Sequence, residues 1–166
     1  MRYLVFAICA TSMIGCGGNG SSGGKALPTT DSHAQHNLAT LNMYRAQNGV
    51  AALTLDDQLM TFSGDAVAAY EASGTAHAYF GAQGSKLWSE GFCSGAGENQ
   101  APNWPITNGD EDATIDAILA AMFGEGPNGG HYQNIMNDKF TRVGVGLIVT
   151  SKAGLWFSND FSNACN

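Results

Sequence analysis

Basic side chains are scarce in this 166-residue sequence, which has 7 Lys and Arg residues against 14 Asp and Glu and a net charge of −7. These few basic residues do not gather into a cluster. Nucleic acid is bound largely through basic side chains that neutralise its phosphates. The composition therefore excludes nucleic acid as a partner.

Charged residues of either sign are also few, at 13% of the chain, whereas hydrophobic residues make up 44%. Disordered chains have the opposite balance, because too few apolar side chains cannot offset the entropy lost on folding. The length leaves room for one ordinary domain and not for a second. We expect one globular domain over residues 31–166.

The common signatures of catalysis are missing. The sequence has no H-E-x-x-H metalloprotease motif, no G-x-S-x-G nucleophile elbow and no P-loop. GAGENQ, at residues 95–100, lacks the third glycine of a dinucleotide-binding motif. These absences favour a binding protein over an enzyme and leave the question of activity open.

The N-terminal residues 1–15 have an arginine at position 2, an apolar run and then small residues. This pattern is typical of an export signal and is too short for a permanent membrane helix. The following Met-Ile-Gly-Cys, ending at Cys16, resembles the bacterial lipobox, in which the cysteine carries the lipid. We therefore expect lipidation at Cys16. An ordinary cleavage site beside an incidental cysteine is the alternative.

Glycine and serine dominate the stretch after Cys16, which reads GGNGSSGGK over residues 17–25. Such a composition forms a flexible tether. Residues 16–30 are thus expected to hold the folded domain away from a membrane through the lipid. The predicted location is the bacterial cell envelope, facing the periplasm or at the cell surface.

Two cysteines remain for the folded domain, Cys93 and Cys165, because Cys9 leaves with the signal and Cys16 takes the lipid. In an oxidising compartment they can form one disulfide. It would close a loop of about 70 residues and contribute about 4 kcal/mol in the loop-entropy model. Two unpaired thiols are the alternative.

Hydrophobic periodicity and capping residues predict three helices and a short helical turn. Their expected positions are about 32–48, 57–73 behind a cap at Asp56, 110–124 behind an acidic cluster, and 131–137.

Alternating apolar residues predict a C-terminal β-hairpin with strands near 143–149 and 155–161. Residues 74–110 are rich in glycine and proline, so we expect a long irregular connection with one short strand near 97–101. Together these elements predict a mixed α/β sandwich around an antiparallel sheet.

Three residues far apart in the sequence are candidates for one polar site. His77 and His131 lie at the ends of predicted helices, where side chains commonly face a cleft. Glu98 begins the predicted central strand beside small residues. His33 and His36, in contrast, lie in the first turns of the first helix, where solvent exposure explains them.

The order of these motifs resembles the CAP superfamily, which comprises the cysteine-rich secretory, antigen 5 and pathogenesis-related 1 proteins. The motifs are a histidine, Gly-Glu-Asn, Gly-His-Tyr and a Val-Gly-Val-Gly hairpin, and LNMYRAQNGVAALTLDDQL at residues 41–59 is similar to the opening pattern of the family. The resemblance covers residues 31–161. It implies an α-β-α sandwich with a small central antiparallel sheet.

In that family, two histidines and two acidic residues line a shallow cleft. By resemblance, His77, Glu98 and His131 match three of them, and Tyr132 lies beside them in the cleft. For the fourth we favour Glu125 over Asp116. A direct overlay on eukaryotic relatives of the family places Met122 at the position of the fourth residue. Glu125 lies about one helical turn onward on the same side. The resemblance therefore implies that His77, Glu98, Glu125 and His131 converge within a few ångströms.

Two imidazoles and two carboxylates suit a divalent cation of the zinc type, and a hydrogen-bonded polar cluster without a metal is the alternative. Two functions follow from the resemblance. The first is a binding module for a lipid, a glycan or a peptide. The second is a metal-assisted hydrolase in which Glu98 or Glu125 is the general base.

Overall fold

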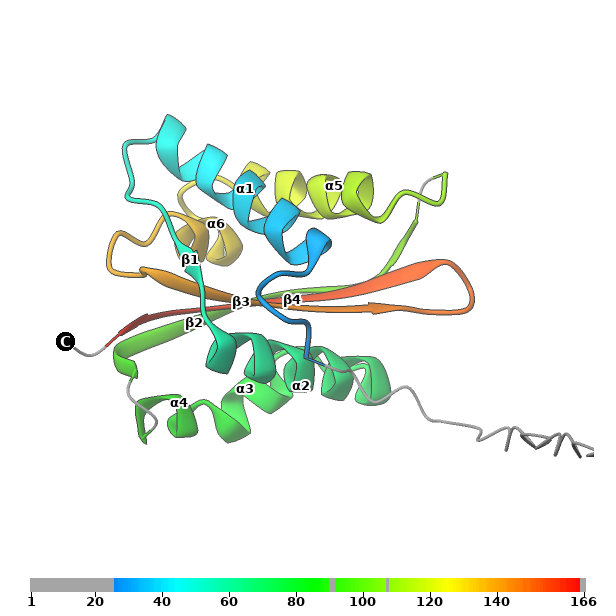
Figure 1. The fold of residues 1–166 in the computed structure, drawn as a ribbon, viewed down its shortest axis with the longest axis horizontal. Coiled ribbons are helices and arrows are strands. Elements are labelled where there is room, and N and C mark those ends of the chain that lie inside the picture. Colours follow the sequence, from blue (N-terminus) through cyan, green and yellow to red (C-terminus); the bar gives the residue numbers. More distant parts are fainter. Residues whose placement is uncertain (1–25, 90–91, 107, 165–166) are drawn as a thin grey trace, which may run out of the picture.

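The structure, a computed structural model, describes residues 26–89, 92–106 and 108–164 (Figure 1). A β-sheet lies between two layers of helices. One layer contains α1 (Ser32–Gln47), α5 (Glu111–Gly124) and α6 (Gly130–Ile135), and the other contains α2 (Asp57–Ser73), α3 (Ala78–Gln83) and α4 (Ser85–Ser89). The predicted α-β-α sandwich is therefore confirmed.

The sheet has four strands in the order β1-β3-β4-β2. Their bounds are β1 Thr54–Leu55, β2 Phe92–Pro105, β3 Arg142–Val149 and β4 Gly154–Ala164. β2, β4 and β3 pair antiparallel, as expected, whereas the short β1 pairs parallel with β3. β1 was missed by the sequence analysis because two residues are too few to show a period. The sheet is therefore mixed, and β2 forms one of its edges.

The expectation of a long irregular connection over residues 74–110 was wrong. This segment contains α3 and α4 and then β2, which is 14 residues long. The strand was not recognised because its glycines interrupt the apolar alternation. In addition, the pairing of β2 with β4 is irregular at two points, between Phe92 and Ala96 and between Ala101 and Trp104.

The helix starts agree with the capping signals. The side chains of Asp31, Asp56 and Asp110 each accept hydrogen bonds from backbone amides in the first turn of α1, α2 and α5. α2 ends at Ser73, and the next residue, Gly74, has a φ of 67°, in the left-handed region that glycine tolerates best. Short-range signals thus set these boundaries.

The alternation of β4 divides its side chains between the two helical layers. Leu155, Phe157 and Phe161 are fully buried in the main core with α1 and α5. On the opposite face Asp160 contacts α2 through Ser63, and Trp156 packs edge-on against Tyr70. One strand therefore carries both the apolar core and a buried acidic side chain.

His33 and His36 are not simply solvated. Nδ1 of His33 lies 2.8 Å from Oδ1 of Asp112, and Nε2 of His36 lies 2.9 Å from Oδ1 of Asp116, so both histidines link α1 to α5. The hydrogen bond with Asp112 raises the pKa of His33. Asp116, the alternative fourth cleft residue, is therefore a partner of α1.

Arg45 near the end of α1 is fully buried. Its guanidinium donates to four backbone carbonyls, those of Ala51, Ile135, Asn137 and Phe140, at 2.7–3.0 Å. Three of these carbonyls belong to the end of α6 and the loop after it. Arg45 thus holds the helix that carries His131 against α1.

Cys16 and Cys165 lie outside the described residues, as does the side chain of Cys93, so the lipid and the disulfide stay predictions. Within the described ranges, no helix has the length and apolar character needed to cross a bilayer.

Candidate functional site

His77 precedes α3 with a φ of 61°, a left-handed conformation that is uncommon for a residue with a side chain. Two contacts hold it there. Its backbone N–H donates to Oε1 of Gln100 at 2.8 Å, and its Nδ1 lies 2.7 Å from Oε2 of Glu98. The His77 side chain is 49% exposed and that of Glu98 is 1% exposed. The imidazole thus covers a buried carboxyl group and faces solvent with its other side.

Glu98 lies in β2 directly opposite Asp160 of β4. Burial raises the pKa of Glu98 to about 7, and hydrogen bonds with Asp160 and Ser158 lower it in part. Burial, followed by the charge of Glu98, raises the pKa of Asp160 well above its usual range. Two acidic groups therefore lie buried between the sheet and α2.

His131 begins its helix beside Glu125, with Nδ1 2.6 Å from Oε1 and the backbone N–H donating to Oε2 at 3.2 Å. The hydrogen bond with the His131 side chain lowers the pKa of Glu125. A Cβ on Gly129 would collide with the Glu125 side chain. The glycine before the Gly-His motif thus provides room for the carboxylate that binds the histidine.

α6 is fixed to the edge strand by asparagines. Nδ2 of Asn134 donates to the carbonyl of Glu98 at 3.1 Å and to Oδ1 of Asn99 at 2.8 Å, and Asn99 donates to the carbonyl of His131 at 3.1 Å. A Cβ on Gly97 would collide with Asn134. The Gly-Glu-Asn motif therefore positions both histidines relative to β2.

The structure brings the four predicted side chains together as two pairs, His77 with Glu98 and His131 with Glu125, on opposite faces of β2. In the described part of the chain, no group of three or more His, Cys, Asp or Glu side chains is arranged to hold a metal ion. As arranged here, the four side chains do not fit one cation. The zinc-type ion stays a prediction from the resemblance and has no part in the proposed function.

A cavity of about 180 Å³ lies beside the second pair. Glu125, His131 and Gln100 are its polar lining, and Gln100 also contacts His77 and Glu98. The remaining walls come from β2 and α5, namely Ala101, Pro102, Trp104, Ile118, Ala121 and Met122. A mostly apolar hollow with a few polar groups in its lining suits an amphiphilic ligand.

Tyr132 was expected beside the histidines in the cleft. Its ring instead packs at 5.1 Å from the ring of Phe123, which stacks at 4.3 Å on Tyr44 of α1. Tyr132 does not belong to the lining of the cavity that contains His131. Its observed contacts join α6 to the other two helices of its layer.

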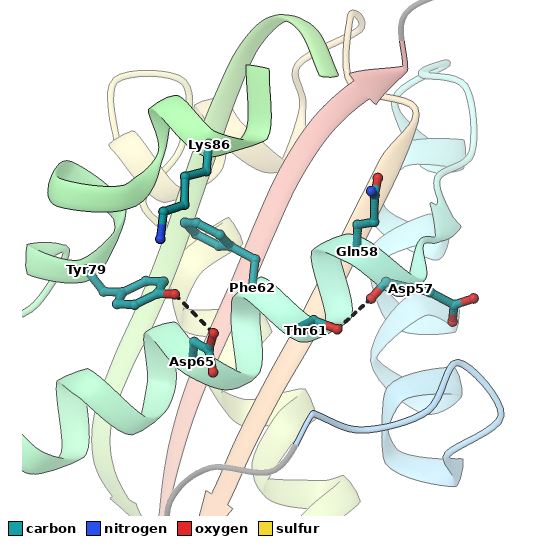
Figure 2. Close-up of a pocket in the computed structure, with 7 residues that line it drawn as sticks. All are labelled: Asp57, Gln58, Thr61, Phe62, Asp65, Tyr79 and Lys86. Carbon is teal, nitrogen blue, oxygen red and sulfur yellow. Dashed lines mark hydrogen bonds between the residues drawn. The ribbon is translucent and has the colours of Figure 1, made fainter. Parts of the chain in front are cut away.

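A larger cavity of about 430 Å³ lies in the other helical layer (Figure 2). Polar and charged side chains surround the buried ring of Phe62 in its lining, and the hydroxyl of Tyr79 donates to Oδ2 of Asp65 at 3.0 Å. The lining residues are Asp57, Gln58, Thr61, Phe62, Asp65, Tyr79 and Lys86. An aromatic ring with hydrogen-bonding groups around it suits a ligand that has both an apolar face and polar groups.

The sequence analysis missed Asp160 and Gln100, which connect the predicted residues. Asp160 carried a usable signal, because an acidic residue inside the buried strand pattern LWFSNDF requires a partner. Gln100 had no such signal in the sequence, since an amide side chain two residues beyond Glu98 is common on a strand face.

Comparisons with known proteins agree with this geometry. The family model described as the cysteine-rich secretory protein family, CAP, matches residues 38–161. A sequence comparison with curated proteins finds no match.

Two solved structures share the fold. An outer surface protein from Borrelia burgdorferi has a TM-score of 0.64 at 16% identity, over 85% of this chain and 98% of that one. The CAP domain of enterococcal PrgA has a TM-score of 0.55 at 18% identity, over 78% of this chain and 59% of that one. Both likenesses concern the fold alone, whereas the family model spans most of the chain. This chain therefore belongs to the CAP, or cysteine-rich secretory protein, family.

Proposed function

We propose that this protein is an exported, lipid-anchored binding module of the bacterial cell envelope whose cavity beside Glu125 and His131 holds one end of an amphiphilic ligand of the lipid type. The observation that carries the proposal is the cavity itself, which has mostly apolar walls and the hydrogen-bonded pair of Glu125 and His131 in its lining. Its volume of about 180 Å³ is below the 300–1,000 Å³ that is usual for whole small ligands. The cavity therefore accommodates only part of an acyl chain.

The hydrogen-bonded pair of Glu125 and His131 supplies a place for the ligand's head group. The side chains of His131 and Glu125 are 29% and 36% exposed, so they can reach a polar group at the entrance without leaving their own hydrogen bond. Trp104, Ile118 and Met122 then contact the apolar end. Binding of this kind requires no turnover, in agreement with the absence of catalytic motifs.

Filling the cavity tests the ligand assignment. Ala121 lines the cavity and is exposed, and its neighbour Ala120 is exposed on the same helix without lining it. We expect Ala121→Leu to weaken binding of a long-chain fatty acid, added below its micelle concentration, by about tenfold or more, equivalent to about 1.4 kcal/mol. Ala120→Leu should bind as the parent does. Trp104 emission reports binding, with Trp104→Phe as the control for signal from the other tryptophans.

Equal fatty-acid affinity in the Ala120 and Ala121 variants would exclude this cavity as the binding site. A glycan bound equally well by both variants would direct attention to the larger cavity beside Phe62. Steady hydrolysis of peptide or ester substrates, abolished by Glu98→Gln, would favour the hydrolase alternative instead.

The anchor has its own test. Cells that express the protein and are fed an alkyne-labelled fatty acid should incorporate the label, and Cys16→Ala should remove it, because Cys16 is the residue that the lipobox-like sequence marks for the lipid. Label that remains on the Cys16→Ala protein would refute lipidation at this position. The fluorescence result above is independent of this outcome.

A further inference from the structure

The contact between Glu98 and Asp160 is not used by the proposed binding site. The two residues are register partners on adjacent strands, so their side chains project from the same face of the sheet toward α2. Asp160 is 0% exposed and the Glu98 side chain is 1% exposed. Two ionised carboxylates at such a place would repel each other without water to screen them.

The neighbouring groups supply hydrogen-bond donors for some of the carboxyl oxygens. Oδ2 of Asp160 accepts from Ser63 of α2 at 2.7 Å and from Ser158 of β4 at 3.0 Å. Glu98 has Nδ1 of His77 at Oε2 and Nε2 of Gln100 at Oε1. Gly144, which is opposite Asp160 on β3, has no side chain. The groups that face the pair from the surrounding elements are thus hydroxyls, one amide and one imidazole.

One oxygen remains without such a donor. Oδ1 of Asp160 is buried and accepts no hydrogen bond from an N–H or hydroxyl group of the described residues. A buried carboxylate oxygen in this position is costly, whereas a carboxylic acid O–H can donate to the adjacent Glu98. The raised pKa of Asp160 supports the same assignment.

We propose that Asp160 is a positioning residue for His77: neutral Asp160 donates its proton to Glu98 in a hydrogen bond, and anionic Glu98 in turn accepts from Nδ1–H of His77. The pair then holds one proton and one negative charge. Nε2 of His77 is left as a hydrogen-bond acceptor on the exposed side of the ring. The site it forms takes a hydrogen-bond donor, such as a hydroxyl or amide group of a ligand.

Two replacements of Asp160 separate positioning from simple packing. Asp160→Asn keeps a donor of nearly the same shape, so at pH 8 His77 should retain its Nδ1–H tautomer. Asp160→Val removes the donor, while its branched side chain suits a strand. Glu98 then becomes a buried carboxyl group with fewer hydrogen bonds, takes up a proton and donates to Nδ1, so that His77 changes to the Nε2–H tautomer.

Long-range ¹H–¹⁵N spectra of the full chain in detergent, labelled on histidine, report the tautomer. His131 is the internal control, because its Nδ1 also meets a glutamate, the exposed Glu125, and its tautomer should be the same in all variants. An unchanged His77 tautomer in Asp160→Val, or a changed one in Asp160→Asn, would overturn the proposal.

A measurement on the parent covers the case in which Asp160→Val does not fold. Carboxyl ¹³C shifts should show Asp160 protonated at pH 8, and an ionised Asp160 at that pH would overturn the proposal.

The proposal also predicts how the free energy of unfolding depends on pH. Because the folded pair binds protons that the unfolded carboxylates have lost above about pH 4.5, the free energy of unfolding should fall as the pH rises from 5 to 8. A free energy of unfolding that rises between pH 5 and 8 in the parent, and rises less in Glu98→Gln, would contradict the shared proton.

Discussion

Arg45→Met should lower the free energy of unfolding by about 4 kcal/mol, because the methionine side chain fills much of the same space but donates no hydrogen bonds. Four carbonyl groups lose their donor at once, and three of them lie at the end of α6 or in the loop after it. Denaturant unfolding followed by far-ultraviolet circular dichroism measures the change.

Arg45→Lys is the matched control, since it keeps the positive charge. A lysine ammonium has three donors at one point and cannot reach four carbonyls spread around a planar guanidinium, so we expect roughly half the loss. Hydrogen exchange should accelerate in α6 before it does in α2. An Arg45→Met protein within about 1 kcal/mol of the parent would show that packing alone holds α6 in place.

Gly146→Ala should destabilise the fold by about 3 kcal/mol, and Gly144→Ala by a similar amount. A Cβ on Gly144 would collide with the backbone of Leu59, and one on Gly146 with the backbone of Ser63, both in α2. Backbone atoms inside a helix cannot turn aside as a flexible side chain can. α2 must therefore move away from the sheet, and Ser63 loses its contact with Asp160.

Gly124→Ala provides the comparison for these two variants. Gly124 ends α5, and a Cβ there would meet nothing within 4 Å. The alanine should be neutral or stabilising by up to about 1 kcal/mol, through its better helix propensity. Thermal unfolding of the three variants gives the order. Equal losses at Gly124 and Gly146 would mean that glycine flexibility, and not the close approach of α2, explains the Val-Gly-Val-Gly pattern.

Local signals predicted most of the fold. The caps at Asp56 and Asp110 and the alternation in β3 gave boundaries within one or two residues, because each depends on neighbours in the sequence, whereas β4 continues to Ala164, three residues past its expected end. β1 and most of β2 could not be predicted in this way. Their pairing with β3 and β4 is a long-range property, and Gly97 of β2 is explained only by Asn134 of α6, which packs on it.

The site was predictable in its residues and less so in its arrangement. The resemblance identified His77, Glu98 and His131, and the helix spacing favoured Glu125, which does pair with His131. The division into two pairs depends on which face of β2 each side chain occupies. Asp160 becomes a neighbour of Glu98 only through the register between β2 and β4, which the sequence does not reveal.

The edge position of β2 also matters for how copies of this protein behave when they are close together. A strand of 14 residues at a sheet edge could serve as a template for a strand from another molecule. Pro102 and Pro105 are both exposed on it and have no N–H to offer, and its two irregular points bend the ladder. At the other edge, β1 has only two residues. Both open sides of the sheet are thus poorly suited to edge-to-edge aggregation, which favours a protein that stays monomeric when crowded.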